Sequence, residues 1–190
     1  RFRETGWTGH TEIMGQEVRV ESRQRHAIAG HDLEHFDTFA SESRAGTLHT
    51  DGAITYPADP PVSGEHRPIP ADCGVYSEQI PNENMVHTLE HGSIGLLYAP
   101  DLEVDQIREL EAIVSDFDDH TFSMPYEGAM DTPIVIAAWG HTMELEELEE
   151  DSIRQFIEDF RNKGDAPEKG TPCDNTQNTP FQPVGAEGEA

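Results

Sequence analysis

The sequence predicts an α+β domain in which a small mixed β-sheet is flanked by helices, with the element order α-β-α-β-β-α. Apolar residues recur at helical spacing over 103–117 and 147–162, as on one face of an amphipathic helix. Short apolar runs bounded by turn residues predict the strands, at 93–98, 121–124 and 133–139. Helices and strands that alternate in this way are typical of a central sheet with helices packed against it.

The first helix is expected at 83–91, with Asn82 as its N-cap and Gly92 at its C′ position. At about 100° per residue, one third of the helical wheel carries two imidazoles and a carboxylate, and apolar residues occupy the opposite side. The residues of this polar face are His87, Glu90 and His91. Such a helix can pack its apolar side into a core and present metal ligands on the other side.

The two later helices have their own inward faces. In 103–117 the expected inward residues are Val104, Ile107, Leu110, Ile113 and Val114, and in 147–162 they are Ile153, Phe156, Ile157 and Phe160. The acidic run 144–151 is interpreted as a solvated helix N-terminus, where carboxylates favour the helix dipole.

Irregular segments flank the regular elements. We expect an N-terminal arm at 1–46, with one candidate edge strand at 17–21, an α+β domain at 47–165, and an extended C-terminal tail at 166–190. The order of elements resembles the later part of a thioredoxin-like fold, although no thioredoxin chemistry accompanies it.

The chain is extremely acidic, with 38 acidic residues, 12 basic residues and a net charge of −26 over 190 residues. A charge spread over the whole chain, with few lysines, is typical of proteins from salt-loving microbes, in which salt screens the self-repulsion. Nucleic acid is a poor partner, because no basic patch could neutralise phosphates. The sequence also predicts no transmembrane segment, since no apolar run is long enough to span a bilayer.

The two cysteines, Cys73 and Cys173, both lie in turn-like segments outside any Cys-x-x-Cys pair. We expect one disulfide between them, which would contribute roughly 4–5 kcal/mol in the chain-entropy model. A structural disulfide indicates an oxidising compartment. The predicted location is therefore extracellular or at the cell surface, after removal of a signal segment.

The segment 87–91 also matches His-x-x-Glu-His, the arrangement of some zinc peptidases. In that chemistry two histidines bind zinc and the glutamate, here Glu90, acts as general base. The motif has only three fixed positions and occurs a second time here, at His31 to His35. For that second pair a solvated surface is the favoured interpretation.

A metal-binding site without catalysis requires fewer specific residues than a peptidase site. Two histidines on one helical turn need one or two further ligands, and His66 lies in a turn-rich loop before the helix. Further candidates are Met124, Met130, Met85 and His49. A mixed His/Met set favours copper, because a thioether is a soft ligand and imidazole suits both copper states. The alternative is that His87 and His91 only bond backbone carbonyls at the helix end.

Several sequence blocks occur together in one family. They are Pro60-Pro61-Val62-Ser63-Gly64-Glu65-His66, Gly74-Val75-Tyr76, Val86-His87-Thr88-Leu89-Glu90-His91-Gly92, Tyr98-Ala99-Pro100 and Ala138-Trp139-Gly140. In this order they resemble an uncharacterised microbial domain-of-unknown-function family, usually secreted or membrane-anchored, over about 47–165. The resemblance implies one shared site for His66, His87, Glu90 and His91, with His49 and Met130 as additions. The chain departs from the family at Glu65, where many members have proline.

The sequence thus predicts an extracytoplasmic metal-binding protein for copper, with zinc as the alternative metal, that stores, delivers or is structured by the ion. His66, His87 and His91 are the primary ligands, Met130, Met124 or His49 complete the shell, and Glu90 orients a ligand histidine. Two other hypotheses stay open: a cell-surface subunit that self-associates through residues 1–46 by strand addition, and a zinc hydrolase.

Overall fold

The computed structural model describes residues 36–38, 48–117 and 119–173. The strands are β1 (Phe36–Thr38), β2 (Gly74–Val75), β3 (Ile94–Tyr98), β4 (Thr121–Pro125), β5 (Ile134–Ala138) and β6 (His141–Leu145). The helices are α1 (Asn82–Glu90), α2 (Val104–Asp116) and α3 (Glu150–Phe160). No helix within these residues is long and apolar enough to cross a membrane.

The strands form one mixed sheet in the order β1-β6-β5-β3-β4-β2. Strands β2, β4 and β3 are parallel, whereas β5, β6 and β1 each pair antiparallel with their neighbours. The α+β class is confirmed, and β2 to β6 follow the strand order of a thioredoxin-like fold. The two cysteines of the chain, Cys73 and Cys173, are bonded to each other.

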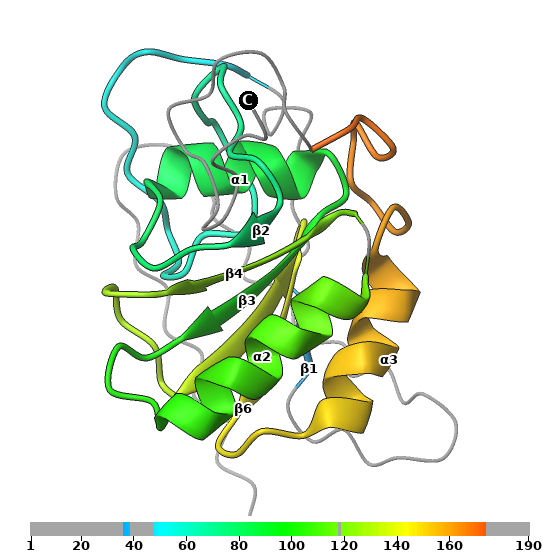
Figure 1. Ribbon diagram of the computed structural model, residues 1–190. Coiled ribbons are helices and arrows are strands. Elements are labelled where there is room, and N and C mark those ends of the chain that lie inside the picture. Colours follow the sequence, from blue (N-terminus) through cyan, green and yellow to red (C-terminus); the bar gives the residue numbers. More distant parts are fainter. Residues whose placement is uncertain (1–35, 39–47, 118, 174–190) are drawn as a thin grey trace, which may run out of the picture.

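Helices cover both faces of the sheet, with α1 on one side and α2 and α3 on the other (Figure 1). Successive strand residues point to opposite faces, and β3 shows this plainly. Ile94 and Leu96 pack in the core under α2 and α3, whereas Leu97 packs in the core under α1. The face under α1 is the one that carries the candidate site.

The strand β6 was absent from the predicted order. Its residues were assigned partly to an acidic helix start, but α3 begins only at Glu150. The chain turns at Gly140, where φ is +74°, and a left-handed conformation of this kind favours glycine. Met143 and Leu145 then reach the core under α2 and α3, and this burial outweighs the acidic character of the segment.

Two details of the predicted helices also differ. Asn82 is the first residue of α1 and not its N-cap, because its amide contacts Tyr126 and Gln79 instead of the helix backbone. Val104 is 59 % exposed, since the first turn of α2 extends beyond the core. Gly92 does lie in the left-handed region after α1, with φ +91°, as expected for a C′ glycine. The candidate strand at 17–21 and the pair His31 and His35 lie outside the described residues.

Candidate metal centre

Helix α1 is buried on every side, and not only on its apolar face. Every residue from Asn84 to Glu90 is buried. The polar face, which was expected to present metal ligands, is covered by the loop that precedes the helix. A polar helix face can be buried only if its groups find hydrogen-bond partners, and the loop supplies several of them.

The loop docks on α1 through side chains of the helix. The Asn84 amide donates to the carbonyl of Ile69 at 2.6 Å. The hydroxyl of Thr88 accepts from the Ala71 amide and lies within hydrogen-bond distance of the Ala71 carbonyl, both at 2.9 Å. These bonds hold the loop along the helix and bring His66 over it.

A backbone bridge places His49 beside His66. The two residues form an isolated parallel β-bridge, in which the Thr50 amide donates to the His66 carbonyl at 2.9 Å and the His66 amide to the Leu48 carbonyl at 3.3 Å. The histidines are 17 positions apart in the chain, and this short pairing is what puts their rings side by side.

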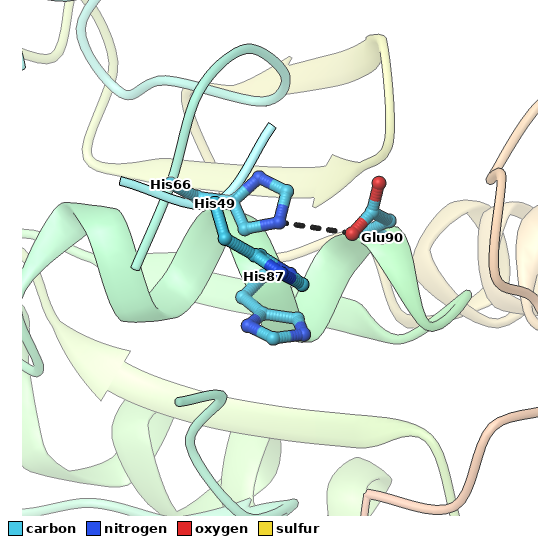
Figure 2. Close-up of side chains that lie close together, drawn as sticks. All are labelled: His49, His66, His87 and Glu90. Atoms are coloured by element: carbon cyan, nitrogen blue, oxygen red, sulfur yellow. Dashed lines mark ion pairs between the residues drawn. The ribbon is translucent and has the colours of Figure 1, made fainter. Parts of the chain in front are cut away.

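Three imidazoles and one carboxylate meet above α1, from His49, His66, His87 and Glu90 (Figure 2). One ligand atom from each lies within 4.8 Å of the others. The ring centroids of the three histidines are 4.7 to 4.9 Å apart. Donor atoms that share a tetrahedral ion at about 2 Å lie about 3.3 Å apart, so small side-chain shifts would let all four bind one cation.

Backbone carbonyls orient two of these rings. Nδ1 of His66 lies 2.9 Å from the Gly64 carbonyl, and Nδ1 of His87 lies 2.7 Å from the Arg67 carbonyl. A carbonyl can only accept, so each Nδ1 carries the proton and donates it. The lone pair of a neutral ring is then on Nε2, which is the arrangement found in metal-binding histidines.

Glu90 lies on the opposite side of the His66 ring from that carbonyl. Its Oε2 is 2.9 Å from Nε2 of His66, and both side chains are 0 % exposed. The two groups are close enough for an ion pair, but they are not aligned for a hydrogen bond. No hydrogen-bond donor among the described residues reaches either carboxylate oxygen. The carbonyls of Gly64 and Arg67 thus orient the rings at Nδ1, and Glu90 faces Nε2 of His66. That Glu90 orients a ligand histidine stays a prediction.

The environment divides the histidines into two electrostatic classes. Burial, together with the neighbouring His91, His66 and His49, lowers the pKa of His87 to about 3 although the Arg67 carbonyl opposes this. Burial also lowers the pKa of His91, against the opposing effect of Glu168 and Glu90. For His66 burial acts in the same direction, but Glu90 and the Gly64 carbonyl outweigh it and raise the pKa. The His87 ring is therefore neutral at physiological pH, whereas the surroundings of His66 favour its protonated form.

His91, predicted as a primary ligand, belongs to a second group. It lies with His87 and Glu168, whose ligand atoms are also within 4.8 Å of one another. Nε2 of His91 is 3.7 Å from Oε2 of Glu168. The structure therefore brings together His49, His66, His87 and Glu90 in one group, and places His91 at its edge.

The predicted methionine ligands lie among apolar side chains. Met124 is fully buried on β4 in the core under α1, together with Met85, and Met130 packs against the same core. That a thioether completes the metal shell stays a prediction. Cys73 and Cys173 form a disulfide with a Cα–Cα distance of 5.4 Å.

The sequence profile of a family described as a protein of unknown function, DUF3105, matches residues 48–175. The chain belongs to this family. Neither a curated protein nor a solved structure matches it. The DUF3105 match covers all four residues of the candidate site and also the segment that carries Glu168.

Glu168 is the site residue that the sequence did not indicate. It lies in the segment 161–173, which follows α3 and reaches the C-terminal end of α1 (Figure 1). In a chain with 38 acidic residues a single glutamate carries no signal. The one signal in the sequence was its position close to Cys173, because the bond to Cys73 brings this segment near the loop before α1.

Proposed function

We propose that this DUF3105 domain binds one transition-metal ion outside the cytoplasm, through His49, His66, His87 and Glu90. The burial of Glu90 is the observation that carries the proposal. Within the described residues no group donates a hydrogen bond to Glu90, and His66, 2.9 Å away, balances its charge only when the ring is protonated. Otherwise a buried carboxylate is costly unless another cation neutralises it. A divalent ion between Glu90 and the three imidazoles would supply that charge and use the Nε2 lone pairs that the carbonyls leave free.

Copper is the first candidate metal and zinc the alternative. Imidazole and carboxylate ligands suit both ions, and among divalent first-row ions Cu²⁺ binds such sites most tightly. Participation of Met124 or Met130 would favour Cu⁺ in addition. Storage, delivery and a structural role are all compatible with this ligand set, because the ion would also fix the His49 and His66 segments onto α1.

We propose Glu90 as a ligand and not as the general base of a zinc hydrolase. A general base must come within hydrogen-bond reach of the substrate, whereas Glu90 and the adjacent His66 side chain are both 0 % exposed. Self-association through residues 1–46 is not part of the proposal, since 36–38 are the only residues of that arm that the structure describes.

Calorimetric titration of tag-free, chelator-treated protein with Cu²⁺ and with Zn²⁺ tests the proposal. We expect one ion per chain, and an affinity that falls by at least about tenfold in Glu90→Gln and in His87→Gln. Glu83→Gln is the matched control, because it makes the same change on the same helix outside the site. Wild-type protein without saturable binding, or variants that bind as well as wild type, would contradict the proposal.

A further inference from the structure

A second group of ligands lies next to the proposed site, at His91 and Glu168. We propose that these two residues form an outer metal position, from which a divalent transition-metal ion passes to the inner site through His87. This inference rests on the proposed function and adds the path by which the ion would reach the inner site. It also gives a role to His91, the predicted primary ligand that the inner group does not include.

The outer position has ligand geometry of its own. The rings of His87 and His91 meet edge to face, with centroids 4.7 Å apart, and Oε2 of Glu168 lies 3.7 Å from Nε2 of His91. Two imidazoles and a carboxylate make a sufficient set for transient binding of an ion that retains water in its remaining positions.

His87 is common to the inner and outer groups. Its Nδ1 is bonded to the Arg67 carbonyl at 2.7 Å, so only the Nε2 lone pair remains for a metal. One lone pair binds one ion. The two groups therefore cannot both use His87 at the same time, and they are better described as successive positions of one ion than as a two-metal centre.

Exposure decreases along this series of ligands. The Glu168 side chain is 47 % exposed and that of His91 5 %, whereas those of His66 and Glu90 are 0 % exposed. A cation that arrives from the side of His91 meets the Glu168 carboxylate first. Negative charge at the mouth of a buried site raises the local cation concentration and the association rate.

Backbone bonds hold Glu168 where the route needs it. The Glu168 amide donates to the carbonyl of Glu90, and the Gly170 amide donates to that of His91, both at 3.1 Å. The disulfide at Cys173 then anchors the end of the segment. Glu168 is thus fixed to the same turn of α1 that carries the inner carboxylate, unlike a glutamate on a free surface.

Trp139 offers an optical readout of the inner site, because its ring centroid lies 6.1 Å from that of His66. Bound Cu²⁺ at that range should quench its fluorescence, and Trp7→Phe removes the only other tryptophan. Stopped-flow mixing of this variant with Cu²⁺ gives the association rate, and mixing the loaded protein with a chelator gives the dissociation rate.

If the outer position is on the route, Glu168→Gln should slow association and dissociation together, by about tenfold. The dissociation constant should then stay nearly the same, because both rates change by the same factor. Glu168→Asp should recover part of the rate. Glu109→Gln on α2 controls for the loss of one exposed charge.

Unchanged rates in Glu168→Gln would overturn the route, and would indicate that ions arrive past the exposed His49 instead. A weaker affinity with an unchanged association rate would also overturn it, since Glu168 would then only stabilise the bound state. Wild-type protein that neither quenches nor releases heat with Cu²⁺ would overturn the proposed function as well, which separates the two failures.

Discussion

At His66 and His87 the same local arrangement leaves one ring nitrogen free to accept a cation. A backbone carbonyl accepts the Nδ1 proton, so the Nε2 lone pair points away from the loop and toward Glu90 or the neighbouring rings. Both carbonyls belong to the loop just before α1, at Gly64 and Arg67. The loop thus sets ring orientation as well as ring position, and no side chain is needed to do so.

Acid should destabilise the metal-free protein partly through His87. Its pKa is lowered to about 3, mainly by burial, whereas an unfolded histidine titrates near 6.5. Between these pH values the histidine binds a proton in the unfolded chain but not in the folded protein. The stability associated with neutral His87 is therefore present above about pH 6.5, and falls by about 1 kcal/mol per pH unit as the pH decreases toward 3.

Urea unfolding of wild-type and His87→Gln protein between pH 4 and pH 7.5 measures this effect. As the pH falls, the unfolding free energy of the wild type should decrease relative to that of the variant. His66 acts in the opposite direction in both proteins, because its raised pKa favours the protonated folded state at low pH. If the unfolding free energies of the two proteins changed in parallel with pH, His87 would take up its proton in the folded chain as readily as in the unfolded chain.

At the scale of elements, α1 depends on the loop that covers it. Every turn of the helix after its first residues is buried, and its polar side chains bond loop backbone instead of water. The helix, the loop and the imidazoles are therefore one structural unit. A change that loosens the loop should weaken the site without touching a ligand.

Thr88→Val tests this dependence, because valine has nearly the same shape but lacks the hydroxyl. The buried Ala71 amide would lose its acceptor, at a cost of about 1–3 kcal/mol in unfolding free energy. Chemical denaturation measures the loss. Ser115→Ala removes a hydroxyl that bonds the α2 backbone at the surface, and should be nearly neutral. Equal effects of the two substitutions would show that Thr88 does not hold the loop.

The elements differ in how well the sequence indicated them. Helices α1, α2 and α3 and strand β3 were found within about three residues, because a repeat of apolar positions is a local property. Strand β6 was missed because the acidic residues around Glu144 concealed the alternation of Met143 and Leu145. Strand β2 has only two residues, Gly74 and Val75, and exists through its pairing with β4.

At the scale of the whole molecule, the disulfide joins the loop before α1 to the segment after α3. It joins residues 100 positions apart and anchors the segment 161–173 that carries Glu168. Replacing Cys73 and Cys173 by alanine should lower the unfolding free energy by about 2–5 kcal/mol. Guanidinium denaturation measures this, and reduced wild-type protein should match the double variant. An unchanged midpoint would show that packing alone holds the segment.

The net charge of −26 makes a second prediction about the whole chain. Repulsion among carboxylates destabilises the compact state, and salt screens it. The melting temperature should therefore increase when NaCl is raised from about 0.1 M to about 2 M. Circular dichroism melts check this, with an uncharged osmolyte such as sucrose as the control for surface exclusion. A melting temperature that is independent of salt would argue against adaptation to salt.

The sequence by itself determined the histidine pair of α1 and the class of the fold. Helical and strand periodicities are set by local hydrogen bonding, so they can be recognised without knowledge of the rest of the chain. The spacing of His87 and His91 placed both rings on one helical turn in the same way. It also assigned both rings to the same ion as His66, whereas in the structure only His87 of the two lies in the group that contains His66.

Tertiary structure alone decided which residues join this pair. His49 and His66 reach it through a backbone bridge, and Glu168 through a segment anchored beyond α3 by the disulfide. Contacts between distant residues depend on the path of the connecting loops, and periodicity carries no information about that path. For the same reason the sequence showed a helix with a polar face, but not that a loop would bury that face together with Glu90.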